Sequence, residues 1–329
     1  MTSETILEPD LEIVDPHHHL YPAYHWVPDG KPYLLQEFAR DLTSGHRVVS
    51  TVYVECSQLF RRTGPEHLRG NGEAEFAAVT ARLAETGHFG PARVCEGFVG
   101  AADLLRPDLL DELLDGLEAA SDGRLRGIRY PMNRDPDPGI NPSKRPYAAP
   151  GIMADETFRK SLRRLTDRGL IFDAWQYFPQ LTELGALAAA LPDTTFVANH
   201  CGGLLGTRAY AEPGNFARWK AEVVDLARHP NVMMKLGGLA NDRTGFGFAA
   251  RKEDAGQDEL VATWGPYIET CIEAFGPTRC MFESNFPVDM CATNYRTLWN
   301  TFKQIVAAFS ADEKAALFAG TARRVYRLS

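Results

Sequence analysis

Short apolar runs rich in β-branched residues recur along the whole chain, and most of them are followed by a stretch with the periodicity of an amphipathic helix. The eight apolar runs are residues 11–15, 48–56, 94–100, 125–130, 170–175, 195–200, 232–238 and 279–285. The helical patterns are residues 34–42, 73–86, 107–120, 155–169, 181–192, 215–230 and 259–276, with two more at 295–309 and 311–328. Strands that alternate with helices in this way predict an α/β protein with a parallel sheet.

The number of alternations selects one architecture. Eight strand–helix units in 329 residues fit a (β/α)8 TIM barrel, which typically has about 250 residues plus insertions. A doubly wound open sheet is the competing arrangement, but it usually has a glycine fingerprint after its first strand, where this chain has histidines. We therefore predict a single TIM-barrel domain over residues 1–329.

Composition and charge narrow the class of protein. The net charge of -8 and the pI near 5.6 argue against a nucleic-acid partner, which favours a basic surface. The six cysteines are scattered without a C-x-x-C pair, as is typical of reduced thiols. No signal-peptide pattern and no apolar run of membrane-spanning length is present in the sequence. We expect a cytoplasmic protein that binds a small molecule and neither nucleic acid nor membrane; the oligomeric state stays open.

The first strand ends in an unusual run of histidines, VDPHHHLY, from Val14 to Tyr21. Alternate side chains of an extended segment share a face. Asp15, His17 and His19 are therefore expected to point into one cavity, and His18 is expected to point away from it. Such an Asp-x-His-x-His set indicates metal ligands or a proton-transfer site.

Polar residues also stand at the ends of the other predicted strands, where a barrel keeps its active site. They are Tyr53, Glu55, Arg129, Asp173, Trp175, His200, Lys235, Glu283 and Asn285. Arg129 and Lys235 are expected to hold a substrate carboxylate, the arginine through paired hydrogen bonds. Trp175 and Tyr53 are expected to contact the substrate as well.

Three of these segments carry a family resemblance. VDPHHHL at strand one, NHCGG at strand six and MFESNFPVD at strand eight resemble the amidohydrolase superfamily, in particular its amidohydrolase-2 branch. That branch includes sugar-acid lactonases and is similar to the 2-pyrone-4,6-dicarboxylate lactonases and to metal-dependent decarboxylases. The resemblance implies a barrel with a hydrolytic or lyase site at its C-terminal mouth and leaves the substrate open.

The chain departs from the family pattern at strand eight. The family usually has an aspartate before an aromatic–proline pair, as metal ligand and general base, and this chain has Asn285. A carboxamide does not accept a proton near neutral pH and is a weak ligand. We therefore expect His17, His19 and His200 to bind at most one divalent metal, zinc, and to bind it weakly. Catalysis without a metal is the open alternative.

Glu283 is the candidate replacement for the missing carboxylate. It lies two residues before Asn285, so both side chains are expected to face inward. A glutamate buried beside histidines is costly unless it is paired or functional. It is interpreted either as a catalytic carboxylate or as the partner of Lys235 or Arg129 in a buried salt bridge.

The sequence thus predicts a hydrolase that acts on the ester bond of a small carboxylated or polyhydroxylated lactone. The predicted catalytic residues are His17, His19, His200, Glu283 and Asn285. One alternative is a lyase, a decarboxylase or hydratase of a small carboxylic acid, that uses the same barrel site. Another is a non-catalytic barrel that binds a small molecule.

Overall fold

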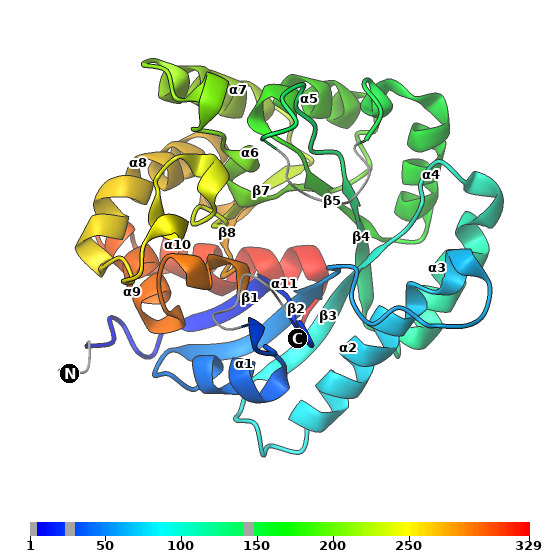
Figure 1. Cartoon of the computed structure of the whole chain (residues 1–329), viewed down its shortest axis with the longest axis horizontal. Coiled ribbons are helices and arrows are strands. Elements are labelled where there is room, and N and C mark those ends of the chain that lie inside the picture. Colours follow the sequence, from blue (N-terminus) through cyan, green and yellow to red (C-terminus); the bar gives the residue numbers. More distant parts are fainter. Residues whose placement is uncertain (1–4, 24–29, 141–147) are drawn as a thin grey trace.

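The computed structural model describes residues 5–23, 30–140 and 148–329. One parallel sheet contains the eight strands in chain order, and Figure 1 shows that it curls into a ring. The strands are β1 (Glu12–His18), β2 (Arg47–Val54), β3 (Arg93–Ala101), β4 (Leu125–Pro131), β5 (Ile171–Trp175), β6 (Phe196–Ala198), β7 (Val232–Leu236) and β8 (Cys280–Phe282). The predicted (β/α)8 barrel is confirmed, and each strand overlaps its predicted run.

The ring closes between the segments that follow β1 and β8. A parallel bridge joins His18 to Phe286. The N–H of Asn285 donates to the carbonyl of His17 at 2.9 Å, and the N–H of His19 donates to the carbonyl of Phe286 at 2.7 Å. The histidine run and the strand-eight motif therefore lie side by side at the closure of the barrel.

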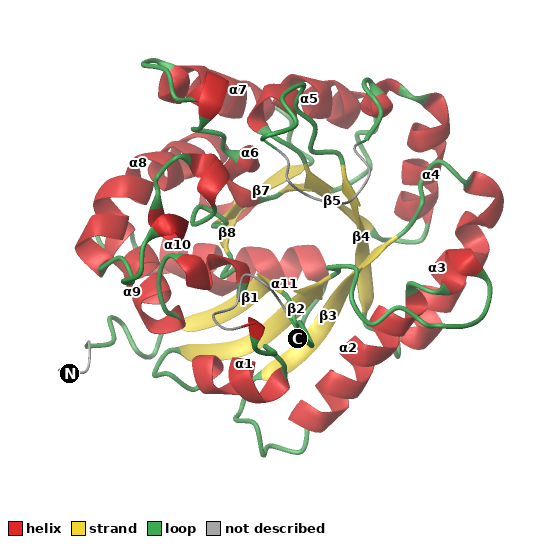
Figure 2. Cartoon of the chain, viewed as in Figure 1, coloured by secondary structure: helices red, strands yellow, loops and turns green. Residues whose placement is uncertain are grey.

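Most helices lie outside the sheet, and the last one packs against the barrel interior (Figure 2). The helices are α1 (Leu35–Leu42), α2 (Asn71–Ala84), α3 (Pro107–Ala120), α4 (Glu156–Asp167), α5 (Leu181–Ala190), α6 (His200–Gly203), α7 (Asn215–Leu226), α8 (Gln257–Phe275), α9 (Tyr295–Ile305), α10 (Ala311–Ala315) and α11 (Thr321–Tyr326). Local signals set several ends: Asp155 caps α4 by accepting the N–H of Phe158, and Ser310 caps α10. Among the described residues, no helix combines the length and apolar character needed to cross a membrane.

The barrel interior has its own apolar layer, separate from the larger core between sheet and helices. Its strand residues are Val14, Val52, Val54, Val99, Ile171, Val197, Met233 and Met281. Ala322, Val325 and Tyr326 of α11 pack against the same layer. These strand residues alternate with residues that face the helices, as the pleat of a strand requires.

This alternation corrects one predicted site residue. Tyr53 lies between Val52 and Val54, whose side chains point inward, so its own side chain points toward the helices. Its hydroxyl donates to the Glu73 carboxylate of α2 at 3.0 Å. Tyr53 therefore lies outside the barrel wall, and the prediction that it contacts the substrate is wrong.

Candidate active site

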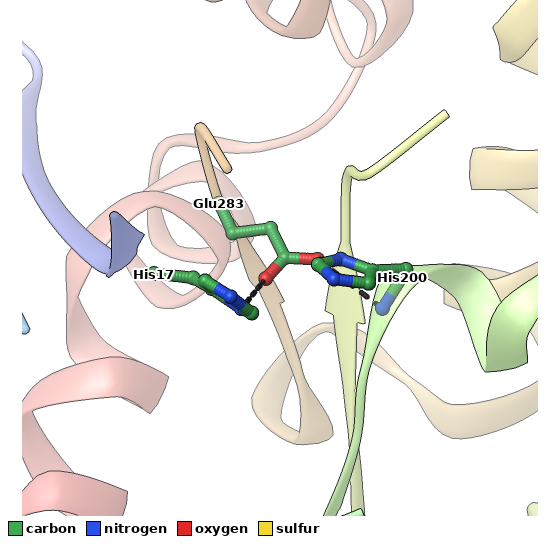
Figure 3. A group of neighbouring side chains, drawn as sticks. All are labelled: His17, His200 and Glu283. Carbon is green, nitrogen blue, oxygen red and sulfur yellow. Dashed lines mark hydrogen bonds and ion pairs between the residues drawn. The ribbon is translucent and has the colours of Figure 1, made fainter. Parts of the chain in front are cut away.

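The strand ends bring three residues from distant parts of the chain together, as Figure 3 shows: His17 from β1, His200 after β6 and Glu283 after β8. The rings of His17 and His200 lie 4.7 Å apart between centroids. His17 and Glu283 are fully buried, and His200 is 7% exposed. The residues that the sequence singled out on strands one, six and eight thus share one cluster.

The Glu283 carboxylate bridges the two imidazoles. Its Oε2 lies 2.6 Å from Nδ1 of His17, and its Oε1 lies 2.6 Å from Nδ1 of His200. The contact with His200 is a hydrogen bond, and because a carboxylate oxygen accepts, Nδ1 of His200 carries the proton and Nε2 of His200 is left with a lone pair. Oε2 approaches His17 at an ion-pair distance but has no hydrogen-bond partner among the described residues.

His19 completes the histidine group. Its Nδ1 lies 2.7 Å from the carbonyl oxygen of Val54 and donates to it, because a carbonyl can only accept. Its Nε2 therefore also has a lone pair, and it lies 3.2 Å from Nε2 of His17. Because Nε2 of His19 only accepts, this contact is a hydrogen bond when Nε2 of His17 carries the proton.

Arg129 of β4 lies beside this pair of histidines. One of its terminal nitrogens, Nη1, lies 3.4 Å from Nε2 of His17. The rest of the guanidinium is held by Glu55: Nε donates to the carboxylate at 2.8 Å, and Nη2 donates to the Glu55 carbonyl. The arginine is thus oriented by one glutamate toward the first histidine.

Lys235 of β7 lies near the other ring nitrogen of His17, Nδ1. Its Nζ lies 3.4 Å from Nδ1 of His17 and 2.9 Å from Oδ1 of Asp173. Asp173 also accepts from the side-chain amide of Asn199 at 2.5 Å and from the Tyr326 hydroxyl at 2.8 Å. Lys235 and Asp173 are fully buried, and these extra hydrogen bonds offset the cost of removing the pair from water.

These pairs correct the interpretation of Glu283 as a salt-bridge partner of Lys235 or Arg129. Both cations have other carboxylates as their direct partners, Asp173 and Glu55. Glu283 contacts imidazoles instead.

Burial and the neighbouring cations keep the strand-one histidines neutral. Burial lowers the pKa of His17 well below its usual value, and Lys235 lowers this pKa further. Burial also lowers the pKa of His19, followed by the effect of Arg129. Burial and the two cations thus both disfavour a positive charge on His17, although Glu283 lies 2.6 Å from its Nδ1.

Asp15 lies outside the histidine cluster, against expectation. Its carboxylate accepts from the N–H of Ser284 at 3.0 Å and from the Tyr295 hydroxyl of α9 at 3.1 Å. The pairing of β1 with β2 shifts register between Asp15 and His18, which breaks the strict alternation of faces. His18 does point away, as predicted, and stacks on Phe38 with ring centroids 4.2 Å apart.

Asn285 lies beside the cluster and contacts a different carboxyl group. Its side-chain amide donates to Oδ1 of Asp289 at 2.8 Å, and burial raises the pKa of Asp289 to about 8. The backbone φ of Asn285 is 52°, a left-handed conformation that asparagine tolerates better than most residues. Its N–H binds the carbonyl of His17, not the imidazole.

Two glycines after β7 support the cluster, and sequence reasoning missed them. A Cβ on Gly238 would lie 2.2 Å from Nδ1 of His200, and a Cβ on Gly237 would lie 2.6 Å from Cγ of Glu283. Any larger residue would displace the histidine or the glutamate. The pair of glycines directly after an apolar strand was the available signal.

Comparison with known proteins places this site in a family. The family model described as "Amidohydrolase" matches residues 14–328. The chain belongs to the amidohydrolase family. This amidohydrolase is 31% identical to the uncharacterized protein y4mH of Sinorhizobium fredii, over 97% of this chain and 99% of that protein. It is 26% identical to an L-fucono-1,5-lactonase of Burkholderia multivorans, over 70% and 71% of the two chains.

Solved structures agree on the fold of the amidohydrolase. A crystal structure of an amidohydrolase from Burkholderia multivorans with bound HEPES has a TM-score of 0.71 and 22% identity, and covers 96% of this chain and 99% of that one. A structure of an amidohydrolase from the same organism with bound zinc has a TM-score of 0.68, 23% identity and the same coverage. The zinc in that protein raises the question of whether the residues of this site fit a metal.

The donor set of this amidohydrolase does not fit a tightly bound divalent metal. Ligands of one tetrahedral zinc ion lie about 3.3 Å apart. The nitrogen–oxygen distances of 2.6 Å around Glu283 are shorter than this spacing, although His17, His200 and Glu283 lie close enough together to form a candidate metal site. The Nε2 atoms of His17 and His19 have a suitable spacing, but Arg129 and Lys235 flank His17 with positive charge.

Proposed function

We propose that this amidohydrolase hydrolyses the ester bond of a small lactone. The observation that carries the proposal is the Glu283 carboxylate, which accepts a hydrogen bond from Nδ1 of His200 at 2.6 Å and lies 2.6 Å from Nδ1 of His17. A histidine held by a carboxylate at one nitrogen is a good proton acceptor at the other. The lactonase names of two relatives support the same reaction.

The chemistry assigned to the site is general base hydrolysis. His200 is the proposed base because its side chain is 8% exposed, whereas the side chains of His17 and Glu283 are fully buried. Its Nε2 takes a proton from water while the water oxygen bonds to the lactone carbonyl carbon. The carbon–oxygen bond of the ring then breaks, and the imidazolium returns the proton to the leaving oxygen. The product is an open-chain hydroxy acid.

Glu283 acts in this scheme through the histidines. Its carboxylate keeps the Nδ1 proton of His200 in place and stabilises the imidazolium that forms during the reaction. Its full burial argues against direct proton transfer from water to Glu283. Glu283 is therefore proposed as a positioning residue, and His200 as the residue that exchanges the proton.

An uncharged, polyhydroxylated lactone suits the site better than a carboxylated one. Arg129 and Lys235 were expected to hold a substrate carboxylate, but each already pairs with a carboxylate of the protein. Trp175, at the end of β5, is half-buried and lies 4.8 Å from the His200 ring, where its flat face can line a sugar-like ring. Zinc, if added, is expected to bind weakly, so the proposed reaction proceeds without it.

The test is a substrate panel with one charge-removing variant. The panel contains neutral sugar-acid lactones, a carboxylated pyrone lactone, an unsubstituted lactone and small carboxylic acids. Proton release measures lactone hydrolysis, and carbon dioxide release measures decarboxylation. Glu283→Gln keeps the shape of the side chain and removes its charge. We expect its turnover of the preferred lactone to fall by about 10²–10⁴ because the base loses its partner.

The matched control is Glu96→Gln. Glu96 lies on β3 at the opposite end of the barrel, where it binds Ser50, Arg93 and Ser329, and its replacement is expected to leave turnover unchanged. Both variants must retain the circular dichroism spectrum of the wild type. The proposal fails if the wild type hydrolyses no lactone of the panel, and release of carbon dioxide would favour the lyase alternative.

A further inference from the structure

The strongest unassigned feature is the buried arginine next to His17. We infer that the Arg129 guanidinium is the electrophile of this site and occupies the place that a divalent metal would otherwise take. The catalytic half of this inference rests on the proposed lactone hydrolysis. The half that concerns metal exclusion does not depend on any substrate.

Arg129 is fixed in one orientation. Its Nε and Nη2 donate to the carboxylate and to the carbonyl of Glu55, a residue that is 1% exposed. These two contacts come from one residue and therefore fix both the position and the plane of the guanidinium. The remaining terminal nitrogen, Nη1, is directed at His17.

The nitrogen that Nη1 approaches is the one that a metal would need. Nε2 of His17 lies 3.2 Å from Nε2 of His19 and, unlike Nδ1, does not face Glu283. Arg129 Nη1 lies 3.4 Å from this Nε2 and places a positive charge beside it. A divalent ion at this nitrogen would lie at contact distance from the guanidinium, where like charges in a buried site repel strongly.

A second cation strengthens the exclusion. Lys235 lies 3.4 Å from the other ring nitrogen of His17, so one neutral imidazole is flanked by two positive groups. The counter-charges Glu55 and Asp173 each bind one of these groups. Glu283 is the remaining carboxylate in contact with His17, and its Oε1 already accepts the Nδ1–H of His200.

The same nitrogen can stabilise the charge that develops during hydrolysis. Nη1 has two N–H groups; one faces His17, and among the residues that the structure describes the other has no hydrogen-bond acceptor. A lactone carbonyl oxygen that accepts this N–H becomes more electrophilic at carbon, and the oxyanion formed on water attack remains bound to a permanent cation. Arginine stays protonated throughout, so this role requires no metal and no proton transfer.

The first arm of the test measures zinc and cobalt binding to Arg129→Met by titration calorimetry and by cobalt absorption. We expect the variant to bind each metal at least ten-fold more tightly than the wild type, because a cation has been removed from the ligand nitrogen. The control is Arg243→Met, an arginine after β7 that lies over the Tyr177 ring, and its metal affinity is expected to equal that of the wild type. Equal metal affinity of Arg129→Met and wild type would overturn the exclusion.

The second arm measures hydrolysis of the preferred lactone. Removal of one oxyanion donor typically costs about 10²–10³ in kcat, and we expect this loss in Arg129→Met with KM nearly unchanged. A loss confined to KM, or no loss, would overturn the electrophile role. Recovery of turnover on addition of zinc would support it, since metal and guanidinium would then substitute for each other.

A double variant controls for a folding defect of Arg129→Met. Arg129→Met removes one charge of a buried ion pair, so both arms are repeated with Arg129→Met/Glu55→Gln, in which both charges of that pair are absent. If the wild type hydrolyses no lactone, the proposed function fails. The comparison of metal affinities would still support or overturn the placement of Arg129.

Discussion

The two ends of this barrel are built from the same eight strands and are held together by different forces. Toward α11 the interior is filled by aliphatic side chains such as Val14, Ile171 and Met233. At the mouth the inward positions carry charged and imidazole groups, among them Lys235 and Glu283, which are equally buried. One end is stabilised by the removal of apolar area from water, and the other depends on the pairing of each polar group.

The difference shows how a buried charge is tolerated in this protein. Lys235 pairs with Asp173, and Arg129 pairs with Glu55. In each pair one strand of the sheet lies between the two that carry the partners. Loss of one partner leaves the other charged and without water, which costs more than loss of a methyl group from the aliphatic layer. The mouth is therefore the more sensitive end to single substitutions that change charge.

The largest loss of stability is expected from Lys235→Met. The substitution leaves the buried Asp173 with only the neutral donors Asn199 and Tyr326, and the removal of one partner of a buried pair typically costs about 3–5 kcal/mol. Urea unfolding followed by tryptophan fluorescence measures the change. Arg164→Met breaks an exposed pair with Asp111 and should leave the midpoint almost unchanged; equal effects of the two variants would contradict the comparison.

A smaller loss of stability is expected from Tyr326→Phe, because this side chain contacts both the aliphatic layer and the charged groups of the mouth. The Tyr326 ring belongs to the aliphatic layer, and its hydroxyl donates to Asp173 at 2.8 Å. Phenylalanine preserves the packing and removes one hydrogen bond to a charged group, so about 1–3 kcal/mol should be lost. The same urea titration measures it. A neutral result would mean that Lys235 and Asn199 alone satisfy the aspartate.

The smallest effect is a change in pH dependence, expected from Glu73→Gln. Burial raises the pKa of Glu73 from 4.5 to about 7, and the Tyr53 hydroxyl and the backbone N–H groups of Cys56 and Gln58, which donate to it, are uncharged. Between these two values the folded state binds more protons than the unfolded state, so this group makes the wild type less stable as pH rises.

The variant should lack that contribution. The free energy of unfolding of Glu73→Gln, minus that of the wild type, should therefore increase from pH 5 to pH 8 and then level off, as measured by urea titrations at fixed ionic strength. A difference that is independent of pH would show that Glu73 titrates normally.

The sequence predicted the architecture because the barrel depends on repeated local patterns. The helix predicted at 107–120 is α3 with the same bounds, since Pro107 stands at its start and leucines follow at helical spacing. Each β-strand coincides with a short apolar run for the same reason. The positions of His17, His200 and Glu283 at one mouth follow from the rule that parallel strands end together.

Contacts that depend on register could not be predicted. Strict alternation of faces predicted Asp15 beside the histidines and Tyr53 inside the barrel. A register shift between Asp15 and His18 breaks the alternation in the first strand. In the second strand Val52 and Val54 face inward, so Tyr53 faces outward. The partners of Arg129 and Lys235 lie on other strands, so only the alignment of those strands decides which carboxylate each cation meets. The role of each residue in catalysis stays a prediction.

The closure between β1 and β8 has a consequence for the order in which this protein acquires its activity. His17 lies near the beginning of the described chain and Glu283 near its end, so the contact between them forms only when the first and last strands meet. Such long-range contacts carry the highest entropic cost and are expected late in folding. An incomplete barrel has the histidines without their carboxylate, and activity should therefore appear only with the last step of assembly.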